Sequence, residues 1–121
     1  MGLKRFVGTV LVATAALVVA SATLAAHHGW TGYDEKTPTT LTGTVKASGY
    51  ENPHAFVELE TKDKTWHVVL APPSRMGSRG LVKDMIKPGT IATVMGYPHK
   101  TDKNELRAER ITVAGRTTEL R

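Results

Sequence analysis

The sequence predicts a mainly β domain, a five-stranded OB-like barrel with one short helix between strands three and four. Three observations predict this class. Five segments have strand patterns, one helical pattern falls between the third and fourth of them, and the first strand is long and interrupted by Gly43 and Gly49. Glycines suit a strand that bends around two half-sheets. An α+β sandwich is the competing architecture, and the long first strand favours the barrel.

A secretory signal is predicted before the barrel, at residues 1–26. Lys4 and Arg5 form a positive start, residues 6–19 are apolar, and small residues follow. A membrane anchor is the alternative, but the apolar run is shorter than the ~20 residues that a spanning helix needs. We therefore expect a periplasmic, exported protein that meets the membrane only through its signal, before cleavage.

The barrel is expected at 39–121, after a leader at 27–38. Its first strand is predicted at 39–48, where apolar or small residues alternate with polar ones. The inward face of that strand would carry Leu41, Gly43, Val45 and Ala47. A turn with Asn52 and Pro53 leads to two further strands, so the first three should form an antiparallel meander at 39–48, 55–61 and 65–71.

The helix is predicted within 74–86, because apolar residues recur there at steps of three and four. Its buried face would consist of Leu81, Val82, Met85 and Ile86. Two more strands, at 90–97 and 106–115, are joined by a polar loop.

Composition limits the function classes. The formal net charge is +5, and loss of Lys4 and Arg5 with the signal lowers it by two. The remaining basic residues are interleaved with acidic ones, which indicates a solvated surface, so no nucleic acid partner is expected. The sequence contains no cysteine, which excludes thiolate metal sites and cysteine nucleophiles.

Histidines are the candidates for chemistry, because imidazole is the commonest metal ligand in proteins. In an OB barrel, the loops between strands one and two and between strands four and five border the usual ligand-binding face. These loops would contain His54 and His99. His67 alternates with inward residues and is expected on the outer surface of its strand.

The two adjacent histidines, His27 and His28, follow the predicted signal directly. Cleavage after Ala25 would leave Ala26 first, and its amine, two amides and the His28 ring form a square-planar nitrogen site that suits Cu(II) or Ni(II). Cleavage after Ala26 would instead let His27 chelate copper together with His54. The sequence thus predicts a copper site from His27, His28 and His54. The alternative is a flexible polar tail, with His54 as a turn residue bonded to local backbone.

A metal-free ligand site is the second hypothesis, formed by the same two loops and the strand ends beside them. Tyr50 and Tyr97 would stack on a ligand, and polar contacts would come from Asn52 and His99. His99 has polar neighbours and is expected to be solvated if it has no such role.

Several motifs together resemble a family of small secreted bacterial proteins known only as a domain of unknown function. They are "HHGW", "LTGTV", "NPH", "RGLVKDMIKPG", "GYP" and "RAERITVAG". The likeness runs from His27 to about Leu120, and its most specific parts are the His-His start and the Asn-Pro-His turn, carried here by His27, His28, Asn52, Pro53 and His54. The resemblance implies export and a small β-rich domain, and it implies no activity.

Three function classes follow. The first is a non-enzymatic, exported copper-binding protein, and the second is a metal-free OB module for an envelope protein or a small ligand. The third, a copper-dependent oxidative enzyme, is disfavoured, because the sequence has no acid, base or nucleophile motif of the kind an active site needs. We therefore expect a protein that is not an enzyme.

Overall fold

The computed structural model describes residues 29–121, and the predicted signal with His27 and His28 lies outside them. The compact unit Gly32–Arg121 holds all the strands. In chain order the elements are β1 (Thr39–Gly49), β2 (Phe56–Glu60), β3 (Thr65–Val69), α2 (Pro73–Ser78), the 3-10 helix η1 (Lys83–Ile86), β4 (Ile91–Pro98), β5 (Glu105–Val113) and β6 (Arg116–Glu119).

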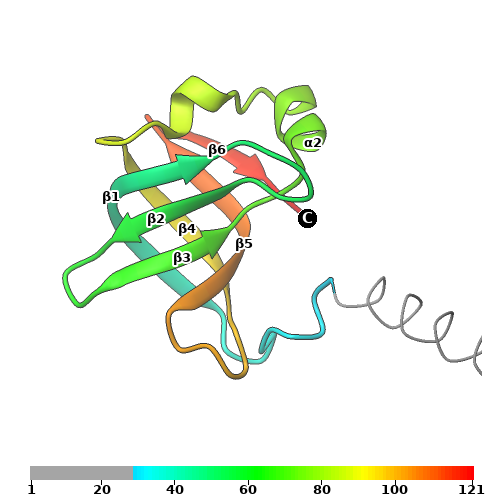
Figure 1. Ribbon diagram of the computed structural model, residues 1–121, viewed down its shortest axis with the longest axis vertical. Coiled ribbons are helices and arrows are strands. Elements are labelled where there is room, and N and C mark those ends of the chain that lie inside the picture. The colour runs from blue at the N-terminus through cyan, green and yellow to red at the C-terminus, as the bar shows by residue number, and fades with distance from the viewer. Residues whose placement is uncertain (1–28) are drawn as a thin grey trace, which may run out of the picture. The chain divides into compact units, whose positions relative to one another are not determined.

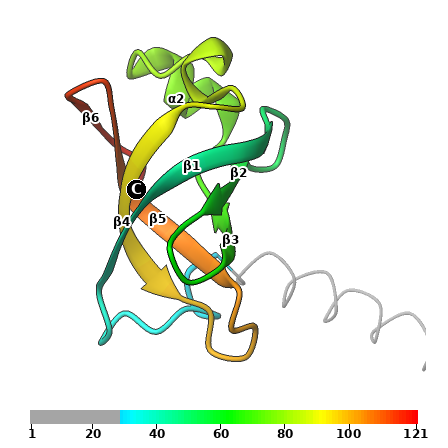
Figure 2. The ribbon, with the colours of Figure 1, turned by 90° about the vertical axis from the view of Figure 1, so that its left-hand side faces the viewer.

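The strands form a sheet in the order β3-β2-β1-β4-β5-β6, and a further pairing between β3 and β5 closes it. The closing pair is parallel, whereas the other pairs are antiparallel. Five strands thus make a mixed barrel, which confirms the predicted fold class. Figures 1 and 2 show α2 at one end of the barrel and the loop between β4 and β5 at the other.

The first strand serves both halves of the barrel. Its start pairs with β4 and its end with β2, and the register shifts between Val45 and Ala47. This bulge inserts one residue, so the predicted inward position of Ala47 is wrong: Ala47 is exposed and pairs with the outward Glu58. The glycine at 43 allows close strand packing, since a Cβ there would collide with the carbonyl of Glu60.

The helical segment after β3 is broken, contrary to the single helix predicted at 74–86. Gly80 takes a φ of +85°, which ends α2 and separates it from η1. Leu81 and Ile86 are buried in the core, as predicted. Val82 was predicted on the same buried face, but it is 50% exposed, because the break turns it outward.

A sixth strand, absent from the prediction, follows β5 through a two-residue turn. Ala114 (φ 51°) and Gly115 (φ 76°) form the turn, and β6 returns along β5 with Thr117 opposite Thr112. Positive φ at both central residues is typical of the tight turns that match the twist of a hairpin.

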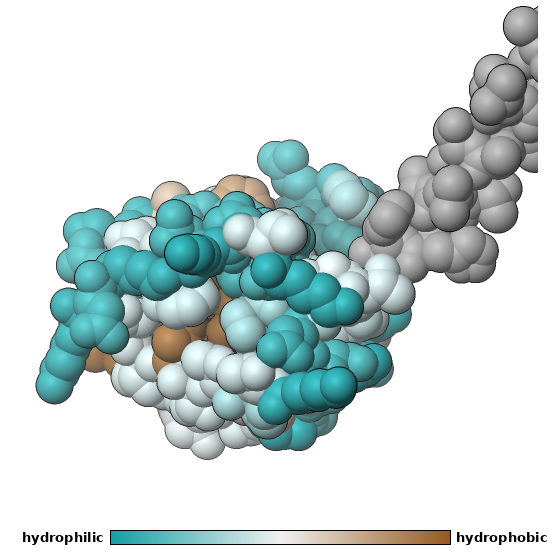
Figure 3. Space-filling model, turned by 90° about the horizontal axis from the view of Figure 1, so that it is seen from below, coloured by the Kyte–Doolittle hydropathy of each residue, from teal (hydrophilic) through white to brown (hydrophobic). Residues whose placement is uncertain are grey.

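The core fills the interior of the barrel and the end covered by α2. It contains inward residues from every strand of the barrel and Met76, Leu81 and Ile86 from the helical segment. Segments next to the strands add Ala55, Leu70, Ala71 and Leu120. On the face seen in Figure 3, hydrophilic side chains predominate and small hydrophobic areas lie between them. Within residues 29–121, no helix is long and apolar enough to cross a membrane.

Candidate ligand-binding face between two loops

The outer face of β5 carries a buried arginine. Leu106 and Val68 pair with each other and lie in the core, so their neighbours Arg107 and Val69, which also pair, point to the outside. Arg107 is nevertheless only 7% exposed. A charged side chain on the outside of a barrel is normally solvated, so other segments must cover this one.

Two of the covering side chains are His54 and Tyr33. Nε2 of His54 lies 3.3 Å from Nη2 of Arg107, and the guanidinium carbon lies 5.9 Å from the centre of the Tyr33 ring. Burial is the main cause that lowers the pKa of Arg107; Tyr33 opposes this effect, and the charges of Arg75 and Arg121 add to it. The guanidinium therefore lies in a partly desolvated environment that also feels two other arginines.

The protonation state of His54 follows from the same neighbours. Burial lowers its pKa first, and the positive charges of Arg107 and Arg75 lower it further. The neutral ring must accept at Nε2, because a guanidinium only donates, and so Nδ1 carries the proton. Two nearby arginines also oppose a metal cation at this ring.

Tyr33 connects Arg107 to the loop between β4 and β5. Its hydroxyl donates to Oε2 of Glu105 at 2.5 Å, and its ring meets the His99 ring edge-on at 5.1 Å. Burial, then the Glu105 hydrogen bond, raises the pKa of Tyr33. Tyr33 also forms a β-bridge with His99, so the end of the predicted leader is paired with the barrel.

His99 is half-buried, whereas its polar neighbours predict a solvated side chain, because hydrogen bonds from its own loop hold the ring. Its Nδ1 accepts from the backbone N–H groups of Thr101 and Asp102, at 3.2 and 2.9 Å. Its Nε2 lies 4.0 Å from Oε2 of Glu105. The ring therefore carries its proton on Nε2 when it is neutral.

These contacts define a continuous surface, which we call the Arg107 strip: His54, Arg107, Tyr33, Glu105 and His99. The loop of His54 lies at the α2 end of the barrel and the loop of His99 at the opposite end (Figures 1 and 2). Contacts through Arg107 and Tyr33 thus connect His54 with His99, and the predicted ligand role of the two histidines stays a prediction.

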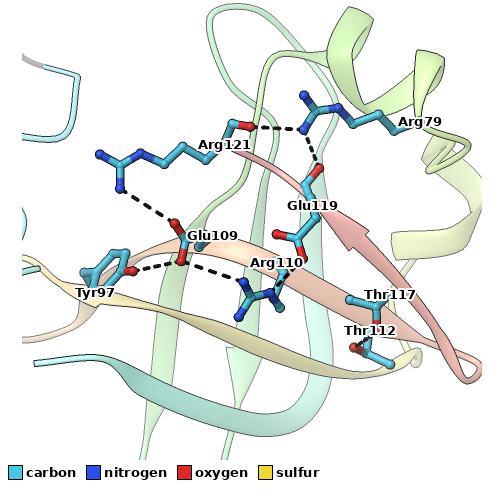
Figure 4. Close-up of polar contacts among 8 residues, drawn as sticks. All are labelled: Arg79, Tyr97, Glu109, Arg110, Thr112, Thr117, Glu119 and Arg121. Atoms are coloured by element: carbon cyan, nitrogen blue, oxygen red, sulfur yellow. Dashed lines mark hydrogen bonds and ion pairs between the residues drawn. The ribbon is translucent and has the colours of Figure 1, made fainter.

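Tyr97 flanks the strip, directly opposite Arg107 on β4. Its hydroxyl donates to Oε2 of Glu109 at 2.8 Å, a hydrogen bond that is the main cause of its raised pKa. Figure 4 shows Glu109 between Tyr97, Arg110 and Arg121. The hydroxyl of Tyr97 is therefore engaged within the protein.

Tyr50 and Asn52 have different surroundings. The Tyr50 hydroxyl donates to the carbonyl of Leu81 at 2.8 Å, and its ring packs against the core, so it links the β1–β2 loop to the helical segment. Asn52 is exposed, next to the cis peptide bond that it forms with Pro53.

His67 pairs with Glu58 across β2 and β3, with Nδ1 and Oε1 2.5 Å apart. It lies on the outer face, as predicted, and its ring is 5.1 Å from that of Phe56. Within the described part of the chain, no three His, Cys, Asp or Glu residues are grouped so that they could hold a metal ion.

Residues 14–107 match the model of a family of unknown function, DUF6152. The chain belongs to this family. The predicted resemblance to a domain of unknown function is thus confirmed. No curated protein matches this DUF6152 chain.

Among solved structures, the DUF6152 chain is similar to TiaS in its complex with a tRNA and ATP, with a TM-score of 0.51, 20% identity and 74% of this chain covered. It is also similar to a ZRD-deleted mutant of TiaS in complex with agmatine, with a TM-score of 0.51, 18% identity and 72% coverage. It spans only 20% and 27% of those two chains. At this identity the likeness concerns the fold alone.

Sequence reasoning did not find Arg107, Tyr33 or Glu105. Arg107 follows the alternation of a half-buried strand, which is typical of a solvated side chain. No local signal says that His54 and Tyr33, both distant in the chain, cover it.

Proposed function

We propose that this protein is an exported, metal-free binding module that takes a small ligand or a segment of an envelope protein on the Arg107 strip. The observation that carries the proposal is the burial of Arg107 on the outer face of β5, 3.3 Å from His54 and next to Tyr33. Export is inferred from residues 1–26 of the sequence.

Burial of a cation costs free energy, so a buried cation is a useful marker of a functional site. Removing a guanidinium from water is unfavourable unless other groups compensate. Groups with shifted pKa values also gather at functional sites more often than elsewhere. Arg107, His54 and Tyr33 all have shifted pKa values and lie together between the two loops that bind ligands in OB barrels.

The fold supports a binding role by analogy only, since OB barrels serve many functions. The similar TiaS structures contain tRNA, ATP or agmatine, and these ligands belong to TiaS. In this chain the basic residues are dispersed, so we propose no nucleic acid partner.

A second candidate function is copper binding by the amino terminus alone. It is favoured by the order Ala26-His27-His28 after a small-residue cleavage site. In this version the amine, two amides and the His28 ring hold Cu(II), and His54 is not needed. The copper site would then share no residue with the Arg107 strip.

A fragment screen by amide NMR on the untagged protein tests the principal proposal. We expect binding fragments to shift the amides of residues 54, 99 and 107 most strongly. A hollow of about 390 Å³ away from the strip, lined by Ser48, Lys83, Asp84, Lys87 and Pro88, serves as the internal comparison. Hits that gather at this hollow and leave the strip unshifted would overturn the proposal.

A further inference from the structure

We propose that the part of the strip formed by Arg107 and His54 binds an oxyanion of the ligand, a carboxylate or a phosphate, with Arg107 as the main recognition group. This inference rests on the proposed function, because it names the chemistry of the ligand that the strip takes.

The geometry of the arginine is the first argument. Arg107 is 7% exposed, and its guanidinium is positioned by the His54 ring on one side and the Tyr33 ring on another. A guanidinium has five N–H donors in a rigid plane and matches a carboxylate or phosphate with two parallel hydrogen bonds. Its position between two rings limits the orientations that such a pair can take.

The sign of the local field is the second argument. The charges of Arg107 and Arg75 disfavour the protonated form of His54. The charges of Arg75 and Arg121 in turn disfavour the charged form of Arg107. Arg75 is held in place, since its Nη1 donates to the carbonyl of Leu120 at 3.1 Å. An anion beside His54 would therefore interact favourably with the charges of both Arg107 and Arg75.

The nearest carboxylates on β5 are engaged elsewhere, which is the third argument. Glu105 accepts from Tyr33, and Glu109 accepts from Tyr97 and pairs with Arg121 at 3.7 Å. Both carboxylates are thus hydrogen-bonded to tyrosines, and the charges that lower the pKa of His54 are those of Arg107 and Arg75.

Neutral His54 is the fourth argument. Its ring accepts from Arg107 at Nε2 and keeps a proton on Nδ1. An oxyanion at Arg107 would stabilise the doubly protonated ring, because it places a negative charge near it. Binding of an oxyanion should therefore raise the pKa of His54, whereas a neutral ligand should leave it nearly unchanged.

Three small probes with the same ring test the inference: benzoate, phenyl phosphate and benzamide. The readouts are the NMR signals of the Arg107 side chain and of the His54 ring in the untagged protein. We expect benzoate or phenyl phosphate to shift both and to raise the pKa of His54, and benzamide to do neither. The stronger of the two anions identifies the oxyanion as a carboxylate or a phosphate.

Variants give the second readout. R107Q should weaken binding of the effective anion about tenfold or more, since charge-assisted hydrogen bonds are lost. R107K keeps the charge and should lose less. R116Q, at an exposed position on β6, removes the same charge and should leave the affinity within about twofold.

The outcomes separate this inference from the proposed function. If benzamide binds the strip as tightly as benzoate does, the proposed function stands, because the face binds ligands. The inference that the ligand carries an oxyanion is then wrong. If every probe shifts residues away from the strip only, both proposals are overturned. Should R107Q fail to fold, the His54 titration in the unaltered protein decides: no rise in its pKa with any saturating anion contradicts the inference.

Discussion

His54 and Arg107 meet at 3.3 Å although they lie on a loop and on a strand that are far apart in the sequence. The contact places a titratable ring against a permanent cation in a half-buried site. The folded state favours the neutral form of this ring, and the free energy of unfolding therefore depends on pH.

Stability should fall as the pH drops below about 6.5, the ordinary pKa of histidine, because His54 has a lower pKa when folded. Below that pH the unfolded chain binds a proton that the folded chain resists, until the pH passes the folded pKa. His54→Gln keeps a neutral polar group and should flatten this part of the profile. Urea unfolding between pH 7.5 and 5 measures it, and an equally steep acid slope in the variant would contradict the assignment.

Tyr33→Phe should destabilise the fold by about 1–2 kcal/mol, because it removes a hydrogen bond to the half-buried carboxylate of Glu105. Tyr97→Phe is the matched control, as it removes a hydrogen bond to Glu109, which keeps Arg121 as an ion-pair partner. We expect the control to cost about 0.5–1 kcal/mol. Chemical denaturation compares the two, and a larger loss for Tyr97→Phe would argue against a special role for Tyr33.

Two glycine-to-alanine substitutions should have opposite effects on the stability of the fold. Gly96→Ala should cost about 1–3 kcal/mol, because a Cβ at this site would collide with the backbone of Arg107 and Ala108 on β5. Gly77→Ala lies in α2, where the added methyl meets only the Tyr50 hydroxyl at 3.7 Å, and it should stabilise by about 0.4–1 kcal/mol. Thermal melts of both variants check the signs. A melting midpoint of Gly96→Ala at or above that of the unaltered protein would refute the close packing of β4 and β5.

The amino-terminal copper proposal predicts that a chain beginning at Ala26 holds one Cu(II) ion against a competing chelator. Native mass spectrometry of untagged protein from the periplasm reads the first residue and the bound metal together. His28→Ala or an amino-terminal tag should abolish tight binding, whereas His54→Ala should not, since Arg107 and Arg75 repel a cation there. Retention of copper by His28→Ala would refute the site.

The fold class could be predicted from the sequence because each strand carries its own pattern. Alternation marks β1 to β5, and the helical spacing between β3 and β4 supplies the order that an OB barrel needs. The bulge after Val45 could not be predicted, since one inserted residue leaves the alternation of 39–48 intact while it reverses the facing of Ala47. For β6 there was a signal, Ala114-Gly115 between two alternating runs, and it was missed.

The candidate site was only partly predictable. The sequence places His54 and His99 in the correct loops, because loop positions follow from the strand order. It gives no indication of Arg107, whose burial depends on three segments that are distant in the chain. Long-range coverage of this kind has no local pattern. No local sequence pattern indicates the hydrogen bonds that the hydroxyls of Tyr50 and Tyr97 form within the protein either.

The parallel pairing that closes the barrel also bears on the order of folding. β3 pairs with β5 through His67 to Val69 and Glu105 to Arg107, so the ring of strands remains open until the last third of the chain has joined. Contacts this far apart in sequence slow folding, because the intervening chain must first lose its freedom. A chain shortened before β5 would keep two unpaired strand edges and should remain a substrate for chaperones and proteases. The Arg107 strip is therefore complete only when β5 has closed the barrel.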